Sequence, residues 1–60
     1  MKYSEFRRKI VKNGWIFVYA TGSHYFYRKE GILSEPVPYH GSKEISGPLV
    51  KKISKSMGLK

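Results

Sequence analysis

Cysteine and aspartate are absent from the sequence, and its only carboxylate side chains belong to four glutamates scattered along the chain. Without cysteine, the protein can form neither a disulfide nor a cysteine-based metal site. Enzymes that hold divalent metal ions usually do so with clustered carboxylates, and this chain has few with which to build such a cluster. We therefore expect no bound metal and no cofactor, and any enzymatic activity should be metal-independent.

Long apolar runs are also missing. A helix needs about 20 consecutive apolar residues to span a bilayer, and no stretch of the sequence comes near that length. The first residues, which begin with Met1 and Lys2, lack the apolar core of a signal peptide. A chain of 60 residues has room for one small hydrophobic core. We therefore expect a single domain over residues 1–60 and a location in the bacterial cytoplasm.

Among the features that the sequence does have, its positive charge is the most informative. Twelve lysines and arginines oppose the four glutamates, which gives a formal net charge of +8. A domain this basic attracts polyanions, and nucleic acid is the leading candidate. A docking face for an acidic protein and a surface that is merely well solvated are the alternatives. A membrane-surface role is less favoured, because no long basic amphipathic helix stands out.

A first helix is predicted over residues 4–12. Ser4 suits its N-cap, because a serine hydroxyl can accept a hydrogen bond from a first-turn amide. Phe6 and Ile10 fall on one helical face, with Val11 beside them. Gly14 supplies a left-handed stop after the last turn.

A second helix is predicted near the end of the chain, opened by Ser46, Gly47 and Pro48. Pro48 suits a position in its first turn, where the missing amide has no cost. Leu49, Ile53 and Met57 recur at helical spacing and form its apolar stripe. Gly58 is a typical C-cap, after which the chain can fold back onto the last turn.

Three extended segments lie between the helices, at residues 15–20, 24–29 and 32–38. The first two are rich in β-branched and aromatic residues, which fit a pleated sheet. The third contains Pro36 and Pro38, which cannot donate ladder hydrogen bonds, so it should lie at an edge or end early. Short connections favour an antiparallel meander. The predicted fold class is α+β, with a three-stranded antiparallel sheet and both helices on one face.

His24 stands out for chemistry because it follows the turn residues Gly22 and Ser23 at the start of the second strand. A neutral imidazole can take the proton from a ribose 2′-hydroxyl, and the resulting alkoxide would attack the adjacent phosphate. Cationic side chains such as Arg28 or Lys29 would stabilise the charge that develops. The alternative for His24 is a half-buried sheet residue or a passive phosphate contact.

The aromatic residues of the sheet allow two interpretations. Tyr19, Tyr25, Phe26 and Tyr27 are suited to stacking on nucleic-acid bases, but a domain this small also needs aromatic bulk for its core. Alternation places Phe17 and Tyr19 on one face of the first strand, and Tyr25 and Tyr27 on one face of the second. The sequence does not show which face the helices cover.

The basic side chains of the helices also have two interpretations. They can contact phosphate, which supplies most of the affinity in non-specific nucleic-acid binding, or they can simply be solvated. The set consists of Arg7, Arg8, Lys9, Lys12, Lys51, Lys52 and Lys55.

Four motifs follow one another along nearly the whole chain. They are residues 2–8 followed by Asn13-Gly14-Trp15, then Gly22-Ser23-His24 with its aromatic strand, then Val37-Pro38-Tyr39-His40, and finally residues 47–53 ending in Met57-Gly58-Leu59. In this order they resemble the HicA-type toxins, the small mRNA interferases of HicA–HicB toxin–antitoxin modules. A single motif such as Gly-Ser-His is unspecific, but all four in sequence are quite specific.

The resemblance implies a fold like that of a double-stranded-RNA-binding domain, in the order α-β-β-β-α. It also implies the toxin component of a type II module, a metal-independent endoribonuclease that cleaves mRNA and so inhibits translation and growth. The catalytic role falls on His24, and a HicB-type antitoxin would bind the toxin and mask this residue. The alternative function is a non-catalytic basic RNA-binding module.

The remaining predicted site residues are those expected to contact RNA, together with His40. His40 matches a family position and is expected to hold the loop before the last helix by hydrogen bonding, in preference to contacting phosphate. No general acid can be assigned from the sequence. The predicted RNA-binding residues are Gly22, Ser23, Arg7, Arg8, Arg28, Lys29, Lys51 and Lys52.

Overall fold

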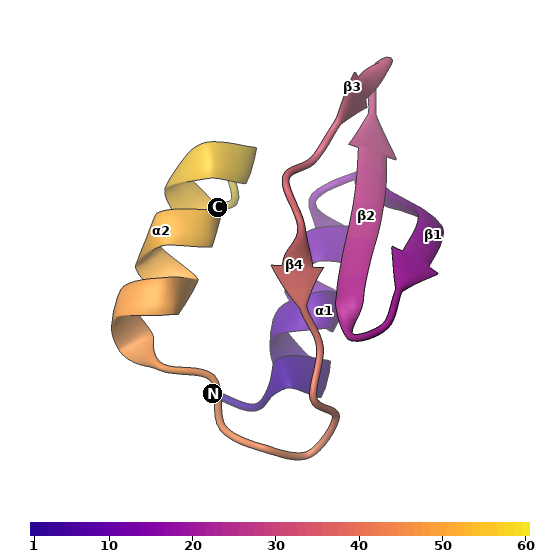
Figure 1. Ribbon diagram of the computed structural model, residues 1–60. Helices are drawn as coiled ribbons and strands as arrows, with labels where there is room; N and C mark the ends of the chain where they lie inside the picture. The colour runs from indigo at the N-terminus through magenta and orange to yellow at the C-terminus, as the bar shows by residue number, and fades with distance from the viewer.

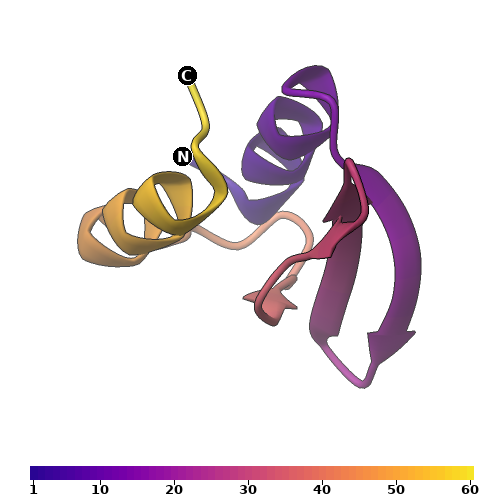
Figure 2. The same ribbon diagram turned by 90° about the horizontal axis from the view of Figure 1, so that it is seen from above.

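The computed structural model describes residues 1–60 and confirms the predicted α+β order of helix, strands and helix (Figure 1). The elements are α1 (Tyr3–Lys12), β1 (Ile16–Thr21), β2 (His24–Lys29), β3 (Ile32–Leu33), β4 (Val37–Pro38) and α2 (Gly47–Met57). Strand β2 is central, because it pairs antiparallel with β1 along one edge and with β3 and β4 along the other. Both helices lie on the same side of the sheet, so its second face is left open (Figure 2).

The third predicted strand is present as two short pieces, β3 and β4, because Ser34 turns inward between them. Ser34 is only 6% exposed, and its hydroxyl accepts a hydrogen bond from the Tyr27 amide at 3.0 Å. The Ser34 amide donates in turn to the Tyr27 carbonyl at 2.7 Å. Pro36 follows without an amide to donate. The segment therefore stays at the edge of β2, as expected, but its ladder is interrupted.

Helix α1 begins one residue earlier than predicted, at Tyr3. Ser4 is not its N-cap, so that prediction is wrong. The Glu5 carboxylate accepts from the Lys2 amide at 2.9 Å, and the Ser4 amide donates to the carbonyl of Gly41 at 3.1 Å. The loop before α2 thus satisfies a first-turn amide of α1, which removes the need for a local serine cap.

Helix α2 is closed at both ends by the residues that the sequence indicated. The Ser46 hydroxyl accepts from a first-turn amide at 3.4 Å, and Pro48 lies in the first turn. Gly58 adopts the left-handed conformation with φ of +63°, and the Leu59 amide then donates to the Ser54 carbonyl at 2.9 Å. Neither helix of the protein has the length and apolar character that crossing a membrane requires.

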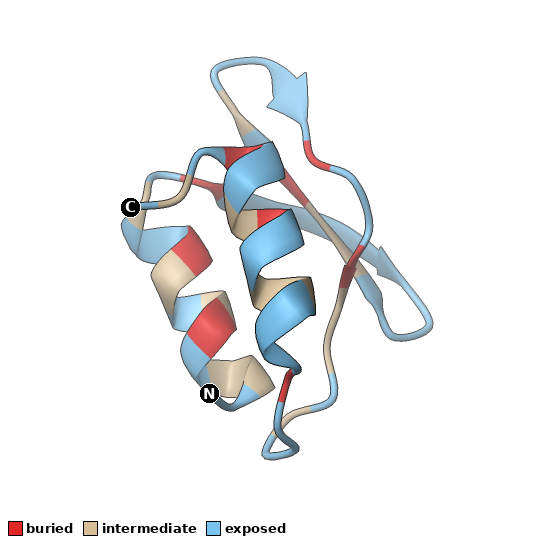
Figure 3. Ribbon diagram, turned by 90° about the vertical axis from the view of Figure 1, so that its left-hand side faces the viewer, coloured by how far each residue is buried: buried red, intermediate tan, exposed pale blue.

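The hydrophobic core joins both helices to β2. Figure 3 shows buried residues where α1 and α2 face each other, and Val11, expected at this face, is exposed instead. The Trp15 indole precedes β1 and donates to the Met57 carbonyl at 3.2 Å, which ties the entry of the sheet to the end of α2. The buried cluster consists of Phe6, Ile10, Trp15, Tyr27, Val37, Ile45, Ile53 and Met57.

Candidate active site and nucleic-acid interface

His24 is exposed at the corner of the sheet where β1, β2 and β4 meet. It is the first residue of β2 and pairs with Thr21 of β1 on one side and with Pro38 of β4 on the other. Strand pairing on both sides fixes the backbone of His24, while its imidazole remains in contact with solvent. A side chain in this position can approach an RNA strand without any rearrangement of the fold.

The turn before His24 depends on the backbone conformation of Gly22. Gly22 has φ of +60°, and a Cβ added there would meet no atom within 4 Å, so conformation and not space requires glycine. Ser23 follows in the turn with an exposed side chain, and its carbonyl accepts from the Tyr39 amide at 2.8 Å. The segment after β4 therefore anchors the turn that presents the histidine.

The two faces of β2 differ in their surroundings, and this settles which side chains accompany His24. Successive side chains of a strand point to opposite faces. Tyr27 is 1% exposed and packs in the core under the helices, with Tyr25 packed against the same core. His24, Phe26 and Arg28 consequently share the open face.

The rings of Tyr19 and Phe26 stack on the open face, with centroids 4.6 Å apart and planes inclined by 10°. The register of β1 against β2 shifts between Phe17 and Tyr19, so that Val18 is an extra residue in a β-bulge. This bulge separates two side chains that simple alternation would place on one face. The prediction that Phe17 and Tyr19 share a face is therefore wrong.

Exposed aliphatic side chains surround Arg28 farther along the open face. Arg28 pairs with Ile16 of β1 and with Leu33 of β3, which are 68% and 50% exposed. A hollow here is lined by Gly14, Ile16, Val18, Arg28, Lys29 and Glu30. The open face thus combines a histidine, an aromatic pair, one guanidinium and an apolar area.

Two of the predicted RNA-binding cations make contacts inside the protein. The Lys29 ammonium donates to the Asn13 carbonyl at 2.8 Å, where it satisfies the end of α1. Arg7 is half-buried near the phenol of Tyr27. Burial raises the pKa of Tyr27 above its ordinary value, and the positive charge of Arg7 opposes this rise. Arg7 and Lys29 therefore also act in the packing of the helices on the sheet.

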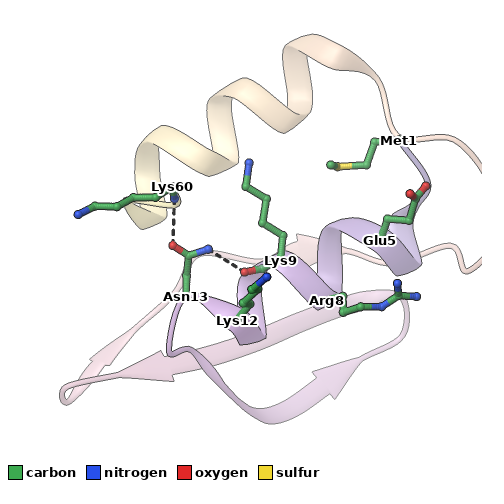
Figure 4. Close-up of a pocket in the computed structure, with 7 residues that line it drawn as sticks. All are labelled: Met1, Glu5, Arg8, Lys9, Lys12, Asn13 and Lys60. Atoms are coloured by element: carbon green, nitrogen blue, oxygen red, sulfur yellow. Dashed lines mark hydrogen bonds between the residues drawn. The ribbon is translucent and has the colours of Figure 1, made fainter.

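A cationic hollow lies between α1 and the last residues of the chain (Figure 4). The Asn13 side chain forms one wall by donating to the Lys9 carbonyl at 2.8 Å and accepting from the Lys60 amide at 2.9 Å. Lys60 could not be found from the sequence as part of this group, because it is 47 residues from Asn13. The lining residues are Met1, Glu5, Arg8, Lys9, Lys12, Asn13 and Lys60, which include four cationic side chains and one carboxylate.

The structure does not gather the predicted RNA-binding residues on one surface. Arg28 shares the open sheet face with His24, and Arg8 lines the cationic hollow. Lys51 and Lys52 are exposed on α2, which covers the opposite side of the sheet. Gly22 and Ser23 lie in the turn directly before the histidine.

His40 lies in the loop before α2, with its ring edge-on to Tyr3. The ring centroids are 4.9 Å apart and the planes are inclined by 86°. The His40 carbonyl accepts from the Lys43 amide at 3.2 Å. His40 thus contacts the start of α1 through its ring and the loop through its main chain. No three His, Cys, Asp or Glu side chains are grouped as metal ligands would be.

Comparison with known proteins assigns the family. Residues 3–59 match the family described as the HicA toxin of bacterial toxin-antitoxin. The chain is also 45% identical over 60 residues to a probable mRNA interferase HicA of Pseudomonas fluorescens (strain Pf0-1), covering 100% of this chain and 98% of that protein. No solved structure matches the chain. The protein therefore belongs to the HicA toxin family.

Proposed function

We propose that this HicA-family toxin is an endoribonuclease that cleaves mRNA in the bacterial cytoplasm, with His24 as its general base. The observation that carries the proposal is the exposed imidazole on a fixed corner of the sheet of a strongly basic protein. Membership of the toxin family, and the description of the Pseudomonas relative as a probable mRNA interferase, support the choice of substrate.

The proposed reaction uses a nucleophile that RNA itself contains. The neutral imidazole of His24 takes the proton from a ribose 2′-hydroxyl, and the 2′-oxygen attacks the adjacent phosphorus. The bond from phosphorus to the 5′-oxygen of the next nucleotide breaks, which leaves a 2′,3′-cyclic phosphate and a 5′-hydroxyl once that oxygen is protonated. Because this chemistry needs no metal-activated water, we propose that cleavage is metal-independent and requires no cofactor.

Arg28 has a supporting place in this proposal. It lies four residues beyond His24 on the same face, which at 3.3 Å per residue is about 13 Å along the strand. Its guanidinium is therefore better placed to hold a neighbouring phosphate of the RNA than the one being cleaved. The charge of the cleaved phosphate would then be stabilised by groups nearer the turn, such as the amides that follow Gly22.

We also propose a HicB-type antitoxin that covers the open sheet face and masks His24. The support is the group of exposed apolar side chains around Arg28, on the same face as His24, to which Ile16 and Leu33 contribute. Contiguous exposed apolar surface is typical of protein interaction sites. Binding of a protein here would block access of RNA to the imidazole.

The test is incubation of the pure protein with a long mRNA, with and without EDTA, next to its His24→Ala variant. We expect cleavage by the wild type in both conditions and at least about 100-fold less by the variant, with fold retention checked by circular dichroism. A folded His24→Ala protein that cuts RNA as fast as the wild type would remove histidine from the mechanism. The alternative, a non-catalytic RNA-binding module, draws on the cationic hollow away from His24 and predicts salt-sensitive RNA binding without cleavage products.

A further inference from the structure

The stacked pair of Tyr19 and Phe26 has no part in the proton transfer by His24, although it lies on the same face. We propose that this pair is a stacking platform for an unpaired base of the substrate RNA, beside the phosphate that is cleaved. The platform would position the substrate and favour single-stranded RNA. This inference rests on the proposed function, since it assigns a substrate contact to the same site.

The first argument is that the fold exposes the Tyr19 ring where alternation would have turned it toward the helices. Phe17, one residue before the bulge, packs against Tyr25 and Tyr27, with ring centroids 5.2 and 6.0 Å away. Tyr19 lies after the bulge and is 46% exposed on the open face. Phe17 is also 39% exposed, but its ring contacts lie on the helix side of the sheet, whereas the bulge turns the Tyr19 ring to the open face.

The second argument is the position of the platform relative to the histidine. Phe26 follows His24 by two residues on the same face, which is about 6.6 Å along the strand at 3.3 Å per residue. Arg28 follows Phe26 by the same interval on the same face. A base on the platform would thus have its sugar and phosphates between an imidazole and a guanidinium.

The third argument concerns the chemistry of the occupant. Aromatic side chains on an open sheet, flanked by cations, are a recurrent way of holding unpaired bases, because every base offers a flat π-face. A net charge of +8 draws a polyanion toward this face. A paired base in a duplex cannot leave its stack without an energetic penalty, so the platform selects single strands.

The closing experiment compares Tyr19→Leu and Phe26→Leu with a matched control, Phe17→Leu, which removes a ring from the other face of β1. The substrate is a short single-stranded RNA with one mapped cleavage site, intact or with an abasic ribonucleotide beside that site. For the wild type and Phe17→Leu, we expect the abasic change to lower kcat/KM by roughly 10-fold, the size expected for one stacked base. On intact RNA, kcat/KM of Tyr19→Leu and Phe26→Leu should be lower than that of the wild type by about the same factor. The abasic change should then lower their kcat/KM little further. Tyr19→Trp, which keeps an aromatic ring, should show the same response to the abasic change as the wild type.

A binding measurement separates failure of the platform from failure of the proposed ribonuclease. The probe is the same RNA with 2-aminopurine beside the site and a 2′-deoxy sugar that prevents attack on the phosphate. Quenching by the wild type and by His24→Ala, but not by Tyr19→Leu, supports the platform even if no RNA is cut. If Tyr19→Leu and Phe26→Leu quench the probe and respond to the abasic change as the wild type does, the platform is rejected.

Discussion

His24 and His40 differ at the scale of the residue in what their side chains touch. Both residues are exposed, but His24 lies on the open sheet face, whereas the ring of His40 packs edge-on against Tyr3 at the start of α1. His24 thus lies on the face proposed to bind substrate, and the ring of His40 contributes to the contact between α1 and the loop before α2. Substituting each histidine in turn therefore compares a proposed catalytic role with a packing role in the same protein.

We expect His24→Ala to reduce RNA cleavage by about 100-fold or more, the usual contribution of a general base. Its free energy of unfolding should change by less than about 0.5 kcal/mol, because the side chain is exposed. His40→Ala should keep cleavage and lose up to about 0.5 kcal/mol of stability, because its exposed ring no longer packs edge-on against Tyr3. Cleavage assays and urea denaturation of both variants check this. Equal loss of cleavage in the two, with both folded, would contradict the assignment.

Tyr27 gives a pH-dependent prediction at the same scale. Burial raises the pKa of its phenol in the folded protein, so the folded state holds this proton more tightly than the unfolded chain. The stability linked to Tyr27 is complete below the unfolded pKa of about 10 and decreases as the pH rises above it. As the pH rises above about 10, urea midpoints should therefore fall more steeply in the wild type than in Tyr27→Phe. Parallel declines in the two proteins would show that other groups control alkaline unfolding.

At the scale of the element, the two helices differ in how well their ends can be predicted from neighbouring residues. The ends of α2 follow from local chemistry, with Ser46 and Pro48 at its start and Gly58 at its end, and all are visible in the sequence. The start of α1 is predicted wrongly because its amides bond to a loop far along the chain. A prediction based on neighbouring residues cannot detect that partner.

The sheet shows the same limit for the candidate site. His24 can be identified from its turn, but its companions on the open face depend on the bulge at Val18 and on which face the helices cover. Strand alternation predicts which residues of a regular strand share a face. It does not predict a β-bulge, and the extra residue Val18 changes the face on which Tyr19 lies. The stacking of Tyr19 on Phe26 is consequently a property of the folded sheet.

Ser34 gives a prediction at this scale, because it links β2 to the interrupted edge strand. Ser34→Ala leaves the buried Tyr27 amide without the hydroxyl that accepts its hydrogen bond at 3.0 Å. An unsatisfied buried donor costs about 1–3 kcal/mol, and we expect a decrease of that size in urea denaturation. The control is Ser56→Ala on the exposed surface of α2, which should change stability by less than about 0.5 kcal/mol. Similar values for the two variants would mean that the hydroxyl of Ser34 does not hold this edge.

Charge acts at the scale of the whole molecule, because the positive side chains lie on several sides of it. The open face with His24 and the cationic hollow beside α1 are lined by different residues. An RNA that contacts both must therefore extend around the protein. We therefore predict that RNA affinity can be weakened at the hollow without changing the residues proposed to carry out cleavage.

Two double variants with equal change in net charge test this separation. Arg8→Gln with Lys12→Gln removes two cations from the hollow, and Lys51→Gln with Lys52→Gln removes two from the exposed side of α2. The hollow concentrates four cationic side chains at one place, so we expect its variant to bind single-stranded RNA more weakly. The slope of log affinity against log salt should become shallower by about 0.7 for each phosphate that the variant no longer neutralises, with kcat unchanged. The α2 variant should show a smaller change in slope. Because the net charge is matched, identical slopes in the two variants would mean that overall charge, and not the hollow, determines how this toxin holds RNA.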